Sequence, residues 1–342
     1  MNSRTHTIIA SLGIALAVAA PAGAQEAPDR EGSQWYDGTV SLQIENDKIS
    51  RTDRHYTNGF RLAWVSDRKE GGPGWMRDTL DFLYPSSLKA ARIGFSFGQT
   101  IFTPNDTEAR ELIRDDRPYA GWLFAGASLH GESQGGPLDI LDTVEVTVGI
   151  IGPQAYGGEV QNNVHSLIGT DEANGWDNQL QNEPALNLML ERRWRLHEPL
   201  SFLGLKADAI PHIGGSAGNV FTFGGTGLIL RLGQGLGIDY GPAHIQPSLS
   251  GPELMTGDNE FAWYLFAGAE GRAVLRNIFL DGNSFADSHG VDHKPFVADF
   301  QVGLTVAYQR VRASLAMMYR TKEFDGQHES DTFGALNLSW HF

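Results

Sequence analysis

The chain has 342 residues and a formal net charge of −15, and it contains 41 Gly but no Cys. The acidic balance argues against a nucleic-acid partner, and against direct contact with anionic phosphates unless divalent cations lie between them. The absence of Cys excludes a disulfide framework.

The N-terminal segment, 1–24, has the pattern of a cleaved secretory signal peptide. Arg4 precedes an apolar run over 8–20, and small residues occupy 22–24. No later run reaches the roughly 18 apolar residues that a membrane-spanning helix needs. If the mature chain, 25–342, lies in a membrane, it must therefore cross as a β-barrel.

Twelve segments with period-two alternation, bounded by Gly, Pro, Asn and Asp, predict β-strands throughout the mature chain. The last one ends in a C-terminal Phe342, with Leu336, Leu338 and Trp340 on the same face, which resembles the assembly signal of bacterial outer-membrane barrels. We predict an all-β fold, a single-domain transmembrane antiparallel β-barrel of about 12 strands. The predicted strands are 39–45, 57–66, 91–100, 121–130, 142–151, 183–192, 200–212, 220–232, 261–280, 296–309, 311–322 and 333–342.

An even number of strands returns both termini to the periplasmic rim of such a barrel, so the connections alternate between the two rims. Most of the dense polar motifs then fall on connections that face outward. We expect the chemistry to gather at this outer rim. The outward connections are 46–56, 101–120, 152–182, 281–295 and 323–332.

One motif is dismissed on structural grounds. The segment 94–98, Gly-Phe-Ser-Phe-Gly, matches the G-x-S-x-G pattern of a nucleophile elbow. That elbow needs a strand-to-helix turn in an α/β sheet, whereas this segment alternates through a barrel strand. Ser96 is therefore expected to face the lumen.

The first outward connection is crowded with hard oxygen donors. Asn46, Asp47, Asp53, Thr57 and Asn58 all carry side-chain oxygens of the kind that Ca²⁺ accepts, with about six to eight needed. The spacing of an EF-hand is absent. The residues alone therefore favour a solvated loop with Asx turns over a metal site.

The second outward connection places Arg117 beside Asp115 and Asp116. This arrangement fits an ion pair that positions the rim, which we favour, or a clamp for a phosphate or carboxylate of a substrate. Tyr119 and Trp122, near the start of the next predicted strand, fit the aromatic girdle at a bilayer interface as well as they fit a structural role at the rim.

The third outward connection is the longest, and its segment 158–169 predicts a short helix that ends at Gly169. Gln161 and His165 are spaced i, i+4 on one face of that helix. A histidine at a rim is usually just a polar residue, yet its pKa near 6.5 also makes it the default general base. The adjoining stripe of the helix is apolar and consists of Val160, Val164, Leu167 and Ile168.

Taken in chain order, these motifs resemble the outer-membrane lipid A 3′-O-deacylase (LpxR-type) family. The similarity spans nearly the whole mature chain, and the order and spacing of the motifs carry it rather than any single one. The matching residues are Asn46-Asp47, Tyr56-Thr57-Asn58-Gly59, Asp116-Arg117, Gly152-Pro153, Gln161, His165, Gly169, Trp176, Gln179 and Gly282-Asn283-Ser284-Phe285.

This resemblance implies a calcium-dependent enzyme that hydrolyses the ester of the 3′ acyloxyacyl chains of lipid A. His165 matches the general base, Asn46 and Asp47 match a polar pair at the end of the first strand, and Thr57 matches the hydroxyl residue that opens the second. Asp171 stands where a known member has Glu. Asp47 and Asp171 are the expected ligands of Ca²⁺.

The resemblance has one clear gap. A Lys that helps to bind substrate in the second connection has no match here, and Arg110 is the nearest basic residue. Arg does not replace Lys as a compact point charge. The substrate preference is therefore less well defined than the barrel or its rim.

Two other functions stay open at this point. An outer-membrane phospholipase acting on glycerophospholipid esters would use the same chemistry, and a structural barrel or small channel could bind lipopolysaccharide without turnover. For the leading hypothesis the partners are lipid A or lipopolysaccharide and the outer membrane, and the protein is expected to act as a monomer.

Overall fold

The computed structural model describes residues 37–46, 55–70, 74–84, 88–196, 199–202, 204–242 and 261–342, without the side chains of 55–57, 168 and 202. The predicted signal peptide, 1–24, lies outside these residues. So does Asp47 of the expected site.

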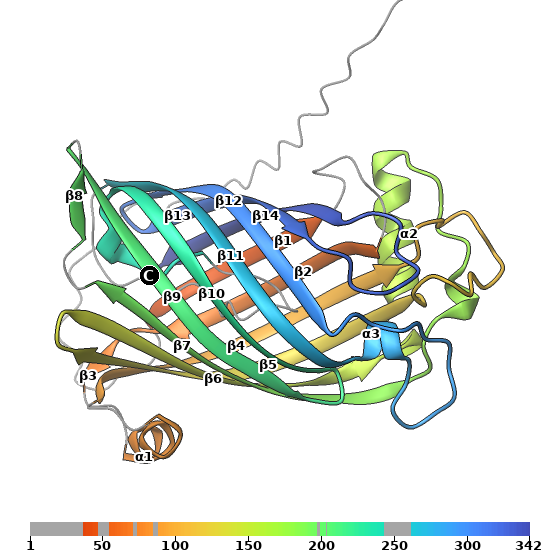
Figure 1. Ribbon diagram of the computed structural model, residues 1–342, viewed down its shortest axis with the longest axis horizontal. Coiled ribbons are helices and arrows are strands. Elements are labelled where there is room, and N and C mark those ends of the chain that lie inside the picture. Colours follow the sequence, from red (N-terminus) through yellow and green to blue (C-terminus); the bar gives the residue numbers. More distant parts are fainter. Residues whose placement is uncertain are drawn as a thin grey trace, which may run out of the picture. The chain divides into compact units, whose positions relative to one another are not determined.

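The structure confirms the predicted barrel. Twelve long strands form one closed antiparallel sheet, in which β9 pairs with β10 and β14 pairs back with β1 (Figure 1). The short strands β3 (Lys69–Glu70) and β8 (Leu200–Phe202) pair with β4 and β9 outside this ring. The twelve are β1 (Gly38–Asn46), β2 (His55–Ser66), β4 (Leu88–Thr103), β5 (Ala120–Gly135), β6 (Leu138–Ile151), β7 (Glu183–Leu196), β9 (Leu205–Gly218), β10 (Phe221–Gln234), β11 (Phe261–Asn277), β12 (Phe296–Tyr308), β13 (Val311–Arg320) and β14 (Asp331–His341).

Each predicted strand overlaps one of these, with ends that differ by up to six residues, and two predicted segments differ further. The predicted segment 200–212 divides into β8 and β9, and the predicted segment 261–280 ends as a strand at Asn277. Among the described residues, no helix is long and apolar enough to cross a membrane. The helices are α1 (Gly74–Leu83), α2 (Gly157–Ile168) and α3 (Ile278–Asp281), with 3-10 turns η2 (Pro153–Ala155), η3 (Trp176–Asn178) and η4 (Leu236–Ile238).

The two ends of the barrel differ in what they carry. The first and last strands meet at one rim, where Gly38 and Phe342 exchange backbone hydrogen bonds of 3.3 and 3.0 Å. Helices α2 and α3 lie at the other end, which we call the α2 rim (Figure 1). An even strand number brings the first and last strands to the same rim. The described parts of the connections predicted to face outward therefore lie at the other end, the α2 rim.

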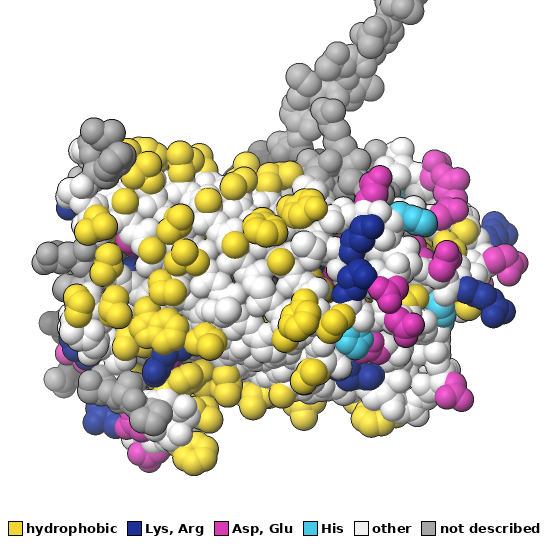
Figure 2. Space-filling model, in the orientation of Figure 1, with side chains coloured by type: hydrophobic (Ala, Val, Ile, Leu, Met, Phe, Trp, Pro, Cys, Tyr) yellow, Lys and Arg dark blue, Asp and Glu magenta, His cyan; other side chains and the backbone are white. Residues whose placement is uncertain are grey.

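Period-two alternation sorts the side chains between the wall and the lumen. In β1, Ser41, Gln43 and Glu45 are buried, whereas Leu42 between them is 41% exposed on the outer wall. Figure 2 shows hydrophobic side chains spread over the wall and charged ones gathered at the α2 rim. This is the distribution that a barrel crossing a bilayer requires.

The lumen holds charged side chains that pair between strands. Arg320 donates to both carboxylate oxygens of Asp299, at 2.8 and 2.9 Å. Arg61 pairs with Glu145 and also donates to Ser96 Oγ at 3.2 Å. Ser96 therefore faces the lumen as predicted. Pairing is necessary because an unpaired ion away from water costs several kcal/mol.

Near the α2 rim the lumen also holds aromatic side chains, which lie beside charged residues such as Arg320. The rings of Phe102 and Phe279 stack with centroids 4.0 Å apart, and Trp122 and Phe221 pack against Phe279. Phe279 belongs to α3, whose apolar side chains are fully buried. Trp122 is thus part of an internal aromatic plug, so the interfacial girdle considered for it is wrong.

Near the opposite rim, Asp239 follows η4 and joins several elements. It accepts hydrogen bonds from the Tyr264 hydroxyl at 2.8 Å and from the backbone N–H of Gly241 at 2.7 Å. It also forms ion pairs with Arg231 and with Arg312, all with fully buried side chains. Burial disfavours the charged carboxylate, but the two arginines outweigh burial and hold the pKa of Asp239 below its usual value.

We expect Asp239→Ala to destabilise the barrel by about 3–5 kcal/mol, because it leaves two buried guanidinium groups without this partner. The urea concentration at the midpoint of unfolding in detergent measures the effect. The matched control is Asp325→Ala, since Asp325 forms an exposed ion pair with Lys294 that should contribute at most about 1 kcal/mol. Equal midpoints for the two variants would contradict this assignment.

Candidate active site

Helix α2 lies within one residue of the predicted segment 158–169 at each end, and glycines explain both ends. At its start, a Cβ on Gly157 would lie 2.6 Å from the Trp176 ring, so only glycine lets the two approach. At its end, Gly169 has φ of 72° and donates its N–H to the carbonyl of His165. This left-handed cap is where glycine is favoured.

The polar face of α2 is buried more deeply than its apolar stripe, of which Val160 and Val164 are half-buried. Gln161 is 3% exposed and His165 is 2% exposed, whereas Leu167 is 86% exposed. Gly157 lies one turn before Gln161 and is also buried. The i, i+4 spacing thus builds a buried polar row along the helix.

The imidazole of His165 is held in one tautomer. Its Nδ1 lies 2.7 Å from the backbone carbonyl oxygen of Asp171. A carbonyl oxygen can only accept, so Nδ1 must carry a proton. In the neutral ring the lone pair then belongs to Nε2, which is the nitrogen that could remove a proton from a substrate or a water.

Asn162 fixes the segment that provides this carbonyl. Its Oδ1 accepts from the Ala173 N–H at 2.9 Å, and its Nδ2 donates to the Ala173 carbonyl at 3.3 Å. Asp171 lies two residues earlier in the same segment. Asn162 therefore ties the carbonyl that orients His165 back to the helix that carries His165.

Trp176 anchors α2 to the barrel. Its Nε1 donates to Gln161 Oε1 at 2.9 Å, and its ring lies 5.0 Å from that of Tyr119. Ile101 and Ala173 complete this small core. Because Ile101 is in β4, the helix is fastened to the sheet itself.

Asn46 reaches the same region through strand register. It ends β1 opposite Asn58 of β2, and Asn58 in turn lies opposite Ile101 of β4. Two strand spacings correspond to about 10 Å. Thr57 precedes Asn58 in β2. The sheet therefore brings Asn46 and Thr57 to the edge on which α2 is fastened.

The expected calcium ligands are placed only in part. Asp171 is exposed, and the contact it makes with His165 uses its carbonyl rather than its carboxylate. Across the described ranges, no three His, Cys, Asp or Glu side chains are grouped so as to hold a metal. The described side chains that could still bind the ion are those of Asn46 and Asp171, and both offer oxygen atoms, which Ca²⁺ prefers as ligands. Calcium binding stays a prediction.

Arg117 is a structural residue rather than a clamp for substrate. It is 1% exposed and donates to Glu323 Oε2 at 2.9 Å, with Phe102 and Phe324 against its guanidinium. Asp116 instead accepts from backbone N–H groups, including that of Arg117 at 2.7 Å. Arg117 does form a fixed ion pair, as favoured from the sequence, but with Glu323, which lies far along the chain from Asp115 and Asp116.

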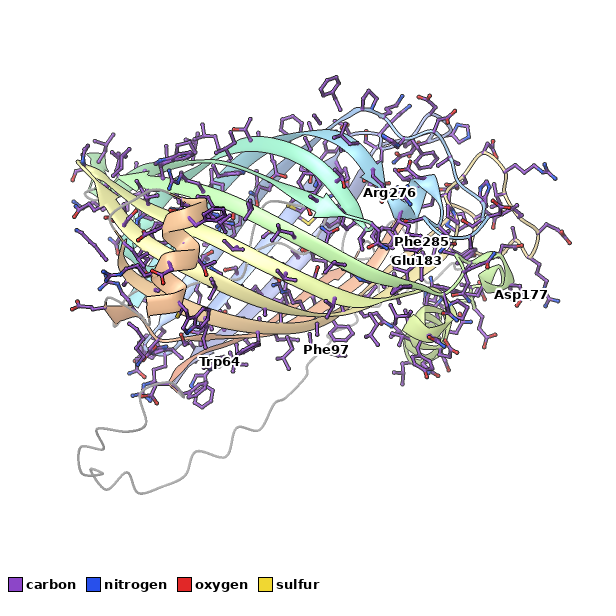
Figure 3. The ribbon with its side chains drawn as sticks, turned by 90° about the horizontal axis from the view of Figure 1, so that it is seen from below. Trp64, Phe97, Asp177, Glu183, Arg276 and Phe285 are labelled. Atoms are coloured by element: carbon purple, nitrogen blue, oxygen red, sulfur yellow. The ribbon has the colours of Figure 1, made fainter. Side chains whose placement is uncertain are left out.

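Glu183 joins three connections at the α2 rim. It accepts from Asn219 Nδ2 at 2.8 Å, from Asn283 Nδ2 at 3.1 Å and from the Ser284 N–H at 2.7 Å. Figure 3 shows Glu183, Arg276 and Phe285 together at this end of the barrel. The polar motif 282–285 is thereby explained as support for the rim.

Sequence reasoning missed Asn162, Glu183 and Glu323 as supporting residues. Glu323 and Arg117 are 206 positions apart, and no local pattern relates them. Asn162 could have been found, because it lies three residues before His165 on the same helix. Arg110 is exposed, and its carbonyl accepts from Asn178, so its side chain has no observed role in this support.

A family model described as outer membrane protein LpxR matches residues 10–342. The chain belongs to the LpxR family. It is therefore an outer-membrane protein, in agreement with its apolar barrel wall. A search of curated protein sequences found no match.

Solved structures agree with the LpxR-family fold. LpxR from Salmonella typhimurium is 23% identical with a TM-score of 0.71, over 89% of this chain and 100% of that chain. The KdgM porin and the β domain of the Bordetella autotransporter BrkA are each 8% identical, with TM-scores of 0.38 and 0.44. Each covers 89% of this chain and 99% of its own. The Salmonella protein shares the fold, whereas the other two scores are too low to add to that conclusion.

We expect Asn162→Ala to loosen the segment that orients His165. Loss of two hydrogen bonds of about 1 kcal/mol each should speed amide hydrogen exchange over 170–174 by roughly tenfold or more. Mass spectrometry of the exchanging protein in detergent measures this. Asn163→Ala is the control, because Asn163 is exposed on the same helix. Unchanged exchange in Asn162→Ala would show that the two Asn162–Ala173 hydrogen bonds do not hold this segment in place.

The Arg117–Glu323 pair predicts a dependence of stability on pH. Burial disfavours the charged form of Glu323, but Arg320 and Arg117 outweigh it and hold its pKa below the usual value. A lowered pKa means stabilisation that is complete above the pKa of the unfolded chain and lost as the pH falls through the folded-state pKa.

Unfolding midpoints in urea between about pH 7 and pH 3 should therefore fall less steeply for Glu323→Gln than for the unchanged protein. Glu323→Gln should also start from a lower midpoint at pH 7, since Arg117 stays buried. Glu111→Gln is the control, because Glu111 is exposed. Identical slopes for all three proteins would refute the assignment.

Proposed function

We propose that this LpxR-family barrel is a calcium-dependent lipid A deacylase that hydrolyses the ester-linked 3′ acyloxyacyl chains of lipid A. The observation that carries the proposal is the buried His165, whose Nδ1 is bound to the Asp171 carbonyl so that Nε2 bears the lone pair. The charged α2 rim would face the outside of the cell and act on the outer leaflet (Figure 2). The protein would act as a monomer.

The chemistry needs no serine nucleophile. His165 Nε2 removes a proton from a water molecule, whose oxygen attacks the ester carbonyl carbon. The bond from that carbon to the sugar oxygen then breaks, and the imidazolium returns its proton to the sugar oxygen. The products are a fatty acid and a free sugar hydroxyl. The Asp171 carbonyl holds the ring in place and stabilises the positive charge that His165 gains.

Further residues and a calcium ion would complete the site. Asn46 and Thr57 lie at the strand edge beside α2, where polar side chains can bind the ester and the sugar. Ca²⁺ held partly by Asp47 and Asp171 would stabilise the oxyanion as a Lewis acid. Asn162 and Gln161 position His165 and take no part in the reaction.

The packed interior argues against an open channel. Paired charges occupy the lumen, and the aromatic plug around Phe279 lies near the α2 rim. A phospholipase remains the alternative with the same chemistry, because the geometry of His165 does not distinguish one ester from another.

His165→Ala should lower deacylation by about 100-fold or more, because a general base typically contributes that much. Asp47→Ala and excess chelator should abolish activity as well. Mass spectrometry of lipid A from overproducing cells reads the loss of the 3′ chains. Ser166→Ala is the control, since Ser166 is exposed beside His165, and heat-modified gel migration confirms that each barrel is folded.

The outcomes separate the three functions. Lipid A that is unaltered in cells with the unchanged protein would favour a non-catalytic barrel. Fatty acids and lysophospholipids released from mixed membranes, without lipid A products, would favour a phospholipase. Full activity in excess chelator would refute only the role of calcium and would leave the deacylase proposal intact.

A further inference from the structure

The outer wall carries a groove that is separate from the candidate active site. Its volume is about 1010 Å³, and strands β9 to β12 and the ends of the adjoining connections line it near the α2 rim. In the sheet, β11 is separated from β2 by β12, β13, β14 and β1. The groove therefore lies on another side of the barrel from Asn46 and His165.

Glycines form the floor of this groove, and at two of them neither close packing nor backbone conformation requires a glycine. A Cβ at Gly224 or Gly271 would meet no atom within 4 Å, and neither residue has a positive φ. Gly215, which does not line the groove, is different, because a Cβ there would lie 2.7 Å from the Phe223 carbonyl oxygen. Glycine within a strand costs stability, and it is found where a ligand or another backbone approaches closely. The first two glycines thus keep space for something outside the chain.

The sides of the groove are apolar and its end is basic. Ile213 is 53% exposed and Phe296 is 74% exposed on the wall. Lys294 and Lys322 line the end nearest the α2 rim, together with Thr321. Figure 2 shows this face with a region of white surface bordered by hydrophobic side chains, and with basic side chains toward the α2 rim.

The lysines can receive an anion at the membrane surface. Lys322 is exposed just beyond β13. Lys294 donates to Asp325 Oδ1 at 2.6 Å, but this pair is exposed, with side-chain exposures of 36% and 71%. An exposed pair is weak and can exchange its partner for a phosphate. In a chain of net charge −15, two lysines above an apolar groove complement a lipid with an anionic head.

We propose that this groove binds one acyl chain of a lipid A molecule, with a phosphate of the same molecule on Lys322 and Lys294. The bound lipid is a neighbour and not the substrate, because the groove and His165 lie on different sides of the barrel. It would hold the protein in a leaflet rich in phosphorylated glycolipid. The proposal rests on the groove and on the outward orientation of the α2 rim given under the proposed function, and it does not need the deacylase activity.

Native mass spectrometry of the purified protein in detergent tests the site. Bisphosphorylated lipid A is the probe, and the mass of the complex shows whether the bound molecule is intact. Gly224→Leu and Gly271→Leu place apolar bulk in the groove at positions where a Cβ meets no atom within 4 Å, and Lys322→Gln removes the exposed charge. Val302→Leu adds apolar bulk elsewhere on the wall, and Lys206→Gln removes an exposed charge near the other rim.

We expect the unchanged protein and both controls to retain one lipid A molecule. The fraction of protein that carries lipid A should be about tenfold lower for each groove variant. Lipid A stripped of its phosphates should bind the unchanged protein as weakly as bisphosphorylated lipid A binds Lys322→Gln. Equal retention by all variants, equal binding of the phosphate-free lipid, or a protein dimer in place of the lipid complex would overturn the proposal. Retention by His165→Ala should match the unchanged protein, so a failure of the deacylase proposal leaves this result intact.

Discussion

Backbone hydrogen bonding in a bilayer is the constraint on which this structure depends. A strand that crosses hydrocarbon has no water to satisfy its N–H and C=O groups, so the sheet must close on itself. Closure here joins β14 to β1 and β9 to β10. Once the ring is closed, alternation sends every second side chain into a narrow lumen, and the sequence must supply residues that can be buried there.

The lumen meets this demand in two ways along its length. Buried arginines pair with carboxylates along it, as Arg231 does with Asp208 toward the opposite rim and Arg320 with Asp299 toward the α2 rim, where aromatic rings also fill it. The charged part is stable only while each ion keeps its partners. The aromatic part has a further effect, because Phe279 brings α3 into the mouth of the barrel. The connections at the rim are thereby built on a packed base rather than on an open pore.

Support of the rim explains how a long connection can hold a histidine in one orientation. Trp176 fastens α2 to β4 through Ile101, and Asn162 fixes the segment whose carbonyl accepts the hydrogen bond from His165 Nδ1–H. These residues form a rigid frame around the imidazole. The groove on the outer wall, at β9 to β12, has a different origin. It exists because glycines stand at strand positions that could carry larger side chains.

Local patterns in the sequence were enough to predict all twelve strands, helix α2 and its end at Gly169. Period two, helical spacing and a left-handed glycine are properties of neighbouring residues, so they can be read without the fold. The same reasoning placed the face of Ser96 and the even strand parity that gathers the polar connections at one rim.

Only the tertiary structure decided what those residues contact. His165 could be placed on a helix from the sequence, but its burial and its bond to the Asp171 carbonyl depend on how the loop folds back. Arg117 was read beside Asp115 and Asp116, yet its partner is Glu323, which is distant in the chain. In the sequence, Gly224 and Gly271 are ordinary strand glycines. Only the structure shows that a Cβ at either position would meet no other atom. Spacing along the chain determines the direction of a side chain, whereas its partner is set by which strands the closed sheet brings together.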